Sequence, residues 1–124
     1  MSVILIVEDN EKNMKLVRDV LQFKGYTTIE AMTGNDGVRL AKEHKPDVIL
    51  MDIQLPDIDG ITALAQIREN SDTQRTPVIA VSASVMPDEQ QRIVASGFDA
   101  YVTKPINVKD FLGVVEKFAR KVRG

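Results

Sequence analysis

One short stretch constrains the fold of this chain more than any other: the apolar run Val48–Met51 leads directly into Asp52, and Pro56 follows four residues later. Pro46 precedes the run. A continuous apolar run of this length, bounded by turn residues, is typical of a strand buried on both faces of a sheet. Ligands of open α/β sheets bind at the carboxyl ends of the strands. We therefore expect Asp52 to belong to a functional site.

Strand and helix patterns alternate five times along the 124 residues. The expected strands are apolar or mixed runs that stop at polar or turn residues: Val3–Val7, Tyr26–Glu30, Val48–Asp52, Val78–Val81 and Ala100–Val102. The expected helices carry apolar residues at helical spacing and cover about 11–24, 38–44, 61–69, 87–96 and 108–122. Thr33–Gly37 is expected as a turn, and the last helix as an apolar stripe of Phe111, Val115, Phe118 and Val122.

This alternation predicts a doubly wound (βα)5 fold, an α/β architecture with a five-stranded parallel sheet covered by helices on both faces. The first, third and fourth strands are the most continuously apolar and should be central. The second and fifth strands are mixed or short and should form the edges. The strand order 2-1-3-4-5, which is the flavodoxin-like order, satisfies this assignment. The length fits one domain over residues 1–124.

The composition excludes several classes of function. A net charge of −2 provides no basic field for nucleic acid or for an anionic membrane. The absence of cysteine excludes disulfides, thiolate catalysis and cysteine-ligated metals. The apolar run at the N-terminus is too short for a signal peptide, and no transmembrane segment is visible. A cytoplasmic location is the resulting expectation.

Polar residues follow four of the expected strands: Glu8 and Asp9, Asp52, Ser82, and Lys104. Crowded carboxylates repel one another unless a cation joins them, and an all-oxygen site suits Mg²⁺. A lysine and a hydroxyl supply further stabilisation for a transferring phosphoryl group. A carboxylate can itself be the nucleophile. Asp52 is the better candidate because it stands alone on a central strand, whereas the adjacent Glu8 and Asp9 indicate a metal pair.

Five motifs of the chain, in this order, resemble the receiver domain of two-component response regulators, the CheY-like family. They are Ile6–Asn10, Pro46–Asp52, Leu55-Pro56 with Asp59-Gly60, Val81–Ala83 and Lys104-Pro105. The resemblance extends over the whole chain and implies the CheY-like receiver fold. It implies that Asp52 is the phosphoacceptor. It also implies that Glu8, Asp9, Asp52 and the backbone carbonyl of Gln54 bind Mg²⁺.

The resemblance assigns roles to residues after the last two strands as well. Lys104 is expected to pair with the phosphoryl oxygens, and the Lys104–Pro105 peptide bond to be cis. Ser82 and Tyr101 are expected to be the coupled switch residues. Ser82 stands where threonine is commoner in the family and keeps the hydroxyl. A change at these residues is expected to remodel the surface formed by the fourth helix, the fifth strand and the fifth helix.

The family resemblance also predicts the partners. A phosphohistidine of a histidine kinase or of a histidine phosphotransferase is expected to donate the phosphoryl group, and a downstream protein to bind the remodelled surface of a monomer. Within the family, the motifs are most similar to those of stand-alone regulators of cell division, which suggests cell-cycle or polarity control. Such a protein is a signalling switch that catalyses only its own phosphorylation and dephosphorylation.

Three alternatives remain at this point. A magnesium-dependent aspartyl phosphatase needs a general acid two residues after the nucleophile, where this chain has Gln54. A flavin-binding flavodoxin analogue needs a phosphate-binding loop after the first strand, where Glu8–Glu11 would repel phosphate. A receiver-like interaction module would work without phosphorylation, although the complete acidic set argues against it. Asp57 and Asp59 are expected to be loop acids, with Gly60 supplying a turn conformation.

Overall fold

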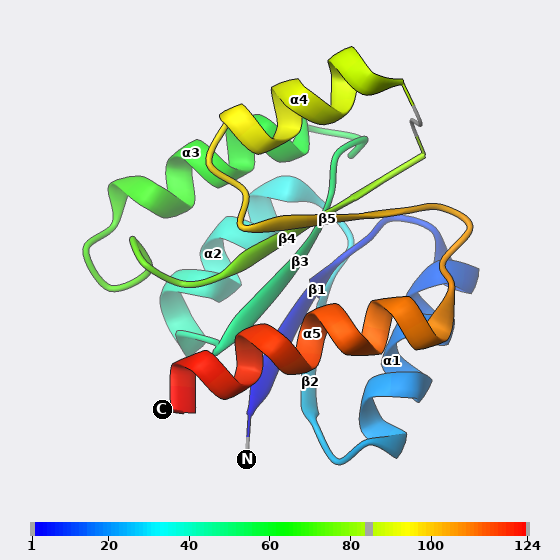
Figure 1. The fold of residues 1–124 in the computed structure, drawn as a ribbon. Coiled ribbons are helices and arrows are strands. Elements are labelled where there is room, and N and C mark those ends of the chain that lie inside the picture. Colours follow the sequence, from blue (N-terminus) through cyan, green and yellow to red (C-terminus); the bar gives the residue numbers. More distant parts are fainter. Residues whose placement is uncertain (1, 84–85, 124) are drawn as a thin grey trace.

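The computed structural model describes residues 2–83 and 86–123, with side chains through residue 119. The strands are β1 (Val3–Val7), β2 (Thr27–Ala31), β3 (Val48–Asp52), β4 (Val78–Ser82) and β5 (Ala100–Thr103). The helices are α1 (Glu11–Phe23), α2 (Gly34–His44), α3 (Gly60–Glu69), α4 (Pro87–Ala95) and α5 (Val108–Arg123). The strands form one parallel sheet in the order β2-β1-β3-β4-β5, which confirms the predicted order (Figure 1).

Helices cover both faces of the sheet: α1 and α5 pack on one face, and α2, α3 and α4 on the other (Figure 1). The side chains of β1 alternate between the two resulting cores. Leu5 and Val7 join the core beneath α2, α3 and α4, whereas Ile4 and Ile6 join the core beneath α1 and α5. This alternation follows from the two-residue period of a strand. It explains why the strand is apolar at every position.

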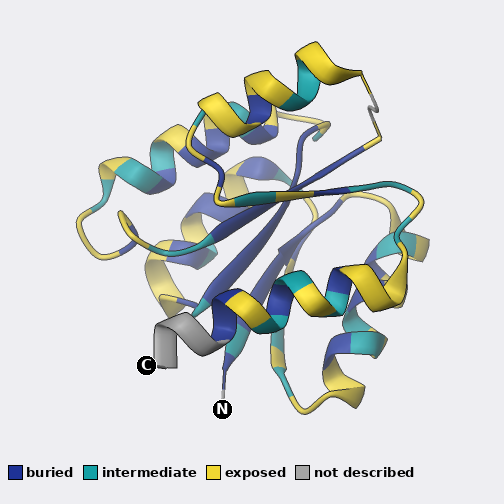
Figure 2. Cartoon of the chain, in the orientation of Figure 1, coloured by how far each residue is buried: buried dark blue, intermediate teal, exposed yellow. Residues whose placement is uncertain are grey.

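Burial along the strands confirms which of them are central (Figure 2). Every residue of β3 and of β4 is buried. In β2 the buried residue is Ala31, and in β5 it is Val102. The edge strands therefore tolerate the polar residues that the sequence places in them.

The start of α2 differs from the sequence-based expectation. Residues 34–37, expected as a turn, form the first turn of the helix. Thr33 is the N-cap, and its hydroxyl oxygen accepts a hydrogen bond from the backbone N–H of Asp36 at 3.1 Å. A capped first turn can contain two glycines because the cap compensates for their low helix propensity.

The apolar stripe of α5 is confirmed for its first three members, because Phe111, Val115 and Phe118 are buried. The side chain of the fourth member, Val122, lies outside the described residues. Among the described residues, no helix is both long enough and apolar enough to cross a membrane.

Parallel strands bring their carboxyl ends to the same edge of the sheet. In the observed register Val7 lies beside Met51, Asp52 beside Val81, and Ser82 beside Thr103. The residues that follow β1 and β5 therefore converge on the ends of β3 and β4. This edge is where the sequence placed its polar residues.

Candidate functional site

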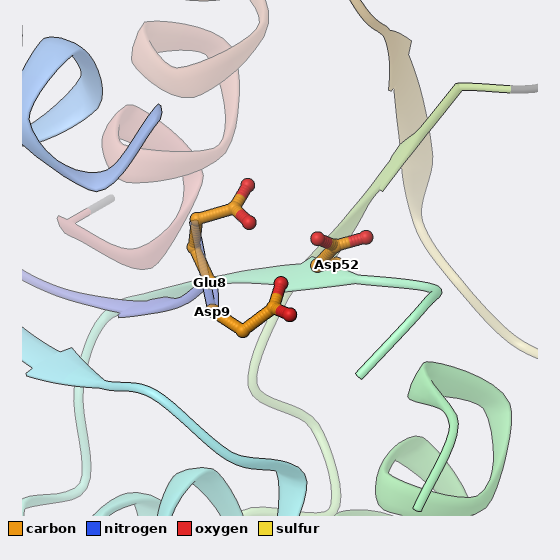
Figure 3. A group of neighbouring side chains, drawn as sticks. All are labelled: Glu8, Asp9 and Asp52. Atoms are coloured by element: carbon orange, nitrogen blue, oxygen red, sulfur yellow. The ribbon is translucent and has the colours of Figure 1, made fainter. Parts of the chain in front are cut away.

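Three carboxylates meet at the carboxyl ends of β1 and β3 (Figure 3). Glu8 and Asp9 follow β1, and Asp52 is the last residue of β3. One oxygen from each lies within 4.8 Å of the other two. Glu8 and Asp52 are each only 4% exposed, whereas Asp9 faces solvent. The structure therefore brings together the three acids that the sequence analysis singled out, with one of them open to a ligand.

The ammonium group of Lys104 reaches into this group from the residue after β5. Its Nζ atom lies 2.9 Å from Asp52 Oδ2 and 3.1 Å from Glu8 Oε1. The backbone N–H of Lys104 donates to the carbonyl of Ser82 at 2.8 Å, which fixes where the side chain begins. The Lys104–Pro105 peptide bond is cis. One lysine thus bridges the two buried carboxylates.

The site carries more negative charge than Lys104 neutralises. Burial, together with the hydrogen bond and the negative charge of neighbouring Asp52, raises the pKa of Glu8 to about 7. Burial alone would lower the pKa of Lys104, but its hydrogen bonds and charge interactions with Asp52 and Glu8 outweigh burial and raise that pKa. Lys104 therefore stays positively charged. Glu8 binds a proton near neutral pH unless a bound cation takes the place of that proton.

The donor set fits Mg²⁺, which prefers carboxylate and carbonyl oxygens and retains several water molecules. Glu8, Asp9 and Asp52 supply the carboxylates. The backbone N–H of Gln54 donates to Asp52 Oδ1 at 3.0 Å, so the Gln54 peptide lies against the phosphoacceptor candidate. One oxygen of each acid lies within 4.8 Å of the others, which is close enough for a divalent cation to contact all three and relieve their repulsion.

Ser82 lies next to the acids, whereas Tyr101 does not. Ser82 ends β4, is 5% exposed and lines a groove of about 430 Å³ together with Gln54 and Met86. Tyr101 in β5 is half-exposed, and its hydroxyl donates to Gln90 Oε1 of α4 at 3.1 Å. The two predicted switch residues therefore stand on either side of α4, with Ser82 on the acidic side.

Asp59 and Gly60, expected as loop residues, have definite structural roles. Asp59 is the N-cap of α3, and its carboxylate accepts a hydrogen bond from the N–H of Thr62 at 2.7 Å. A side chain at Gly60 would collide with the backbone of Asp52 and Ile53, so glycine is needed for close approach. An acid three residues before a helical N–H is a recognisable capping signal that the sequence analysis missed.

Asp57 was also expected to be an ordinary loop acid, and its role is different. Its carboxylate accepts hydrogen bonds from the N–H groups of Gly34 and Asn35 at the start of α2, each at 2.8 Å. These partners lie more than twenty residues earlier in the chain. No local pattern in the sequence signals such a contact.

Comparison with protein families gives a match to the response regulator receiver domain over residues 4–116. Among curated proteins, the chain is 43% identical over 115 residues to the polar-differentiation response regulator DivK of Brucella anthropi. The match covers 93% of this chain and 94% of that protein. The DivK of Brucella ovis matches with the same identity and coverage.

Solved structures with similar folds are receivers too. The receiver domain of a sensor histidine kinase from Pseudomonas aeruginosa, determined with a magnesium ion coordinated in the active-site cleft, has a TM-score of 0.89 at 30% identity. That match covers 95% of this chain and 97% of the other. The chemotaxis response regulator CheY4 of Vibrio cholerae has a TM-score of 0.90 at 25% identity, over 95% of this chain and 98% of the other.

Proposed function

The chain belongs to the response regulator receiver family, and from that premise we propose that it is a signalling switch controlled by phosphorylation of Asp52. The observation that carries this proposal is the placement of the Asp52 carboxylate. It lies at the carboxyl end of the central strand β3, 2.9 Å from the Lys104 ammonium and beside Glu8 and Asp9. A carboxylate held against a fixed cation at the mouth of a parallel sheet is suited to accept a phosphoryl group.

The proposed reaction uses the side chains of this site directly. A carboxylate oxygen of Asp52 attacks the phosphorus of a donor phosphohistidine, the phosphorus–nitrogen bond breaks, and the imidazole leaves as an acyl phosphate forms on Asp52. Lys104, which contacts Asp52 before transfer, pairs with the phosphoryl oxygens afterwards. The N–H of Gln54 holds one carboxylate oxygen and so orients the group.

Glu8, Asp9, Asp52 and the Gln54 carbonyl are the proposed ligands of Mg²⁺. The acidic cluster supports this proposal, as does the similarity to the Pseudomonas aeruginosa receiver with its coordinated magnesium. When bound, the ion would supply positive charge to the phosphoryl oxygens. Glu8 would then remain ionised, because the cation replaces the proton that it otherwise binds.

Ser82 and Tyr101 are the proposed route from the site to the surface. Ser82 follows Val81, the β4 residue that pairs with Asp52, and this position supports a response of Ser82 to a new phosphoryl group. Tyr101 and the exposed side of α4 border a second groove, of about 420 Å³. A change in the Tyr101–Gln90 hydrogen bond would alter this surface, which we propose as the binding site for a downstream protein.

The proposed phosphodonor is a histidine kinase or a histidine phosphotransferase, acting on a monomer in the cytoplasm. The similarity to DivK, which is described as a polar-differentiation response regulator, supports a role in polarity or cell-cycle control. Receivers are in general signalling proteins, and we propose that the chemistry of this chain is limited to its own phosphorylation and dephosphorylation.

Intact mass spectrometry after incubation with Mg²⁺ and acetyl phosphate tests the phosphoacceptor. We expect one added phosphoryl group on the wild type and none on Asp52→Asn. Addition of EDTA before the phosphodonor should prevent the modification. Asp36→Asn, which changes an exposed acid of α2, is the matched control and should be modified like the wild type.

The absence of an adduct on the wild type would lead to a beryllofluoride titration, because rapid hydrolysis can hide a phosphorylated protein. Failure to bind beryllofluoride as well would contradict the proposal and favour an interaction module that works without phosphorylation. Modification of Asp52→Asn would show that another residue accepts the phosphoryl group.

A further inference from the structure

The carboxylate of Asp57 joins the loop between β3 and α3 to the first turn of α2. Asp57 lies between β3 and α3, and its two oxygens each accept one backbone N–H from the first turn of α2, those of Gly34 and Asn35. Both distances are 2.8 Å. These hydrogen bonds lower the pKa of Asp57, with the bond from Asn35 the largest cause. The carboxylate itself is exposed and belongs to no part of the metal cluster.

These two bonds belong to a closed series of contacts that passes through Glu8 and Asp52. The N–H of Glu8 donates to the carbonyl of Ala31 at the end of β2. Three residues later Gly34 donates to Asp57, and three residues before Asp57 the N–H of Gln54 donates to Asp52. Lys104 closes the series by contacting both Asp52 and Glu8.

We propose that Asp57 is a positioning residue for the magnesium site, in that it holds the loop bearing the Gln54 carbonyl at a set place relative to Glu8 and Asp9. This inference rests on the proposed function. Mg²⁺ requires near-ideal octahedral geometry, so a small displacement of one oxygen ligand weakens its binding. Groups behind the direct ligands commonly tune metal affinity in this way.

The rest of the loop explains why one link matters. The loop is closed at its base, where the N–H of Gly60 donates to the carbonyl of Ile53 at 2.8 Å. Gln54, Pro56 and Asp57 are exposed, whereas Leu55 and Ile58 are partly buried and pack against the core, so burial holds only part of the loop beyond that base. Ile58 packs against Gly34, the residue that donates to Asp57. The polar residues of the loop are therefore attached to the rest of the molecule through Asp57 and the start of α2.

A role confined to the stability of α2 makes a different prediction. Thr33 caps the helix independently, through the N–H of Asp36 and the N–H of Gly37. Loss of Asp57 leaves that cap in place and releases the loop. Removal of Asp57 should therefore change metal binding more than it changes helix content.

Calorimetric titration of metal-free protein with Mg²⁺ tests the inference without any phosphorylation. We expect Asp57→Ala to raise the Kd for Mg²⁺ roughly 10-fold, which is the lower end of the range for groups behind metal ligands. Asp57→Asn retains one acceptor oxygen and should lie closer to the wild type. Asp36→Ala removes the same charge from the same end of α2, and its Kd should stay within about twofold of wild type because it breaks no link to the loop.

Hydrogen exchange of the metal-free proteins supplies a second readout. The Gln54 N–H, which is bonded to Asp52, should exchange faster in Asp57→Ala than in Asp36→Ala. Equal Mg²⁺ affinity for Asp57→Ala and Asp36→Ala would overturn the inference while leaving the proposed function intact. Equal weakening by Asp57→Asn and Asp57→Ala would also overturn it, because the lost charge would then suffice as a cause. Failure of the wild type to bind Mg²⁺ would overturn both proposals.

Discussion

Helices α3 and α4 follow neighbouring strands and pack on the same face of the sheet, yet they are held very differently. The N-cap of α3 is Asp59, whose carboxylate accepts the N–H of Thr62, and four residues of the helix are buried. The N-cap of α4 is Met86, which makes no side-chain capping hydrogen bond, and Ile93 is the one buried residue of that helix. α3 begins at Gly60, against the backbone of Asp52, whereas α4 contacts Tyr101 through Gln90.

This difference indicates that, on one face of the sheet, α3 is fixed in position and α4 is free to shift. Full burial of one isoleucine side chain contributes only about 1.5–3 kcal/mol, so α4 can change its position at modest cost in free energy. α3 shares several buried side chains with the core and cannot move without disturbing them. A rigid acidic site next to a weakly anchored helix is a suitable arrangement for the switch that we propose.

The strongest test of this comparison shortens one buried side chain in each helix. Leu64→Ala in α3 should lower the free energy of unfolding by about 3 kcal/mol, because the packed surroundings cannot fill the cavity. Ile93→Ala in α4 should lower it by about 2 kcal/mol, the low end for such a change, because α4 can move to close the gap. Urea denaturation measures both values. Equal costs would show that α4 is anchored as firmly as α3.

The next test measures how much the buried, ionised Glu8 carboxylate lowers the stability of the folded protein. The pKa of Glu8 is about 7 in the folded protein and 4.5 ordinarily, so in this window the folded state binds more protons than the unfolded state. The stabilisation that Glu8 provides is complete below pH 4.5 and is lost as the pH rises to about 7. The free energy of unfolding of metal-free Glu8→Gln, relative to that of wild type, should therefore rise by up to roughly 3 kcal/mol between pH 4.5 and pH 8.

Urea denaturation at both pH values, with and without Mg²⁺, measures this effect. Mg²⁺ should stabilise the wild type at pH 8 and should stabilise Glu8→Gln less, since the variant offers no carboxylate at this position. A pH-independent difference between the two proteins would show that folding does not raise the pKa of Glu8 and would contradict this prediction.

A smaller effect is expected from exchanging the capping properties of the two helices. Asp59→Ala should lower the free energy of unfolding by about 1 kcal/mol, because the N–H of Thr62 loses its partner. Met86→Ser introduces a capping hydroxyl at an exposed position and should raise it by about 0.5 kcal/mol. Hydrogen exchange should show slower exchange at the start of α4 in Met86→Ser. Unchanged exchange there would mean that capping does not limit the order of α4.

The smallest effect is expected at the contact between β5 and α4. Tyr101→Phe removes the hydrogen bond to Gln90. Because this bond is exposed to solvent, the free energy of unfolding should fall by only about 0.5 kcal/mol. Gln90→Ala should have a similar effect, and the double variant should add little more. Full additivity in this double-mutant cycle would show that the bond does not hold α4 in solution.

Much of this architecture was predictable because its causes are local. Continuous apolar runs, which are typical of strands buried on both faces, identified β1, β3 and β4 as central. The mixed or short runs of β2 and β5 identified these strands as edges, and the strand order followed. The clustering of Glu8, Asp9 and Asp52 was predictable because parallel neighbouring strands end at the same edge. The first turn of α2 was missed because two glycines in residues 34–37 resemble a turn when their cap is not considered.

What the sequence by itself determined is therefore the sheet, its order and the list of acids at its edge, since each depends on periodicity and on the type of residue that ends a strand. Only the tertiary structure decided which atoms meet. Lys104 contacts Asp52 across 52 positions of sequence, and Asp57 contacts Gly34 across 23. Such contacts depend on the crossover geometry and on loop conformation, which no local pattern encodes. The physical reason is that a hydrogen bond requires placement to within a fraction of an ångström, whereas burial requires only the correct face.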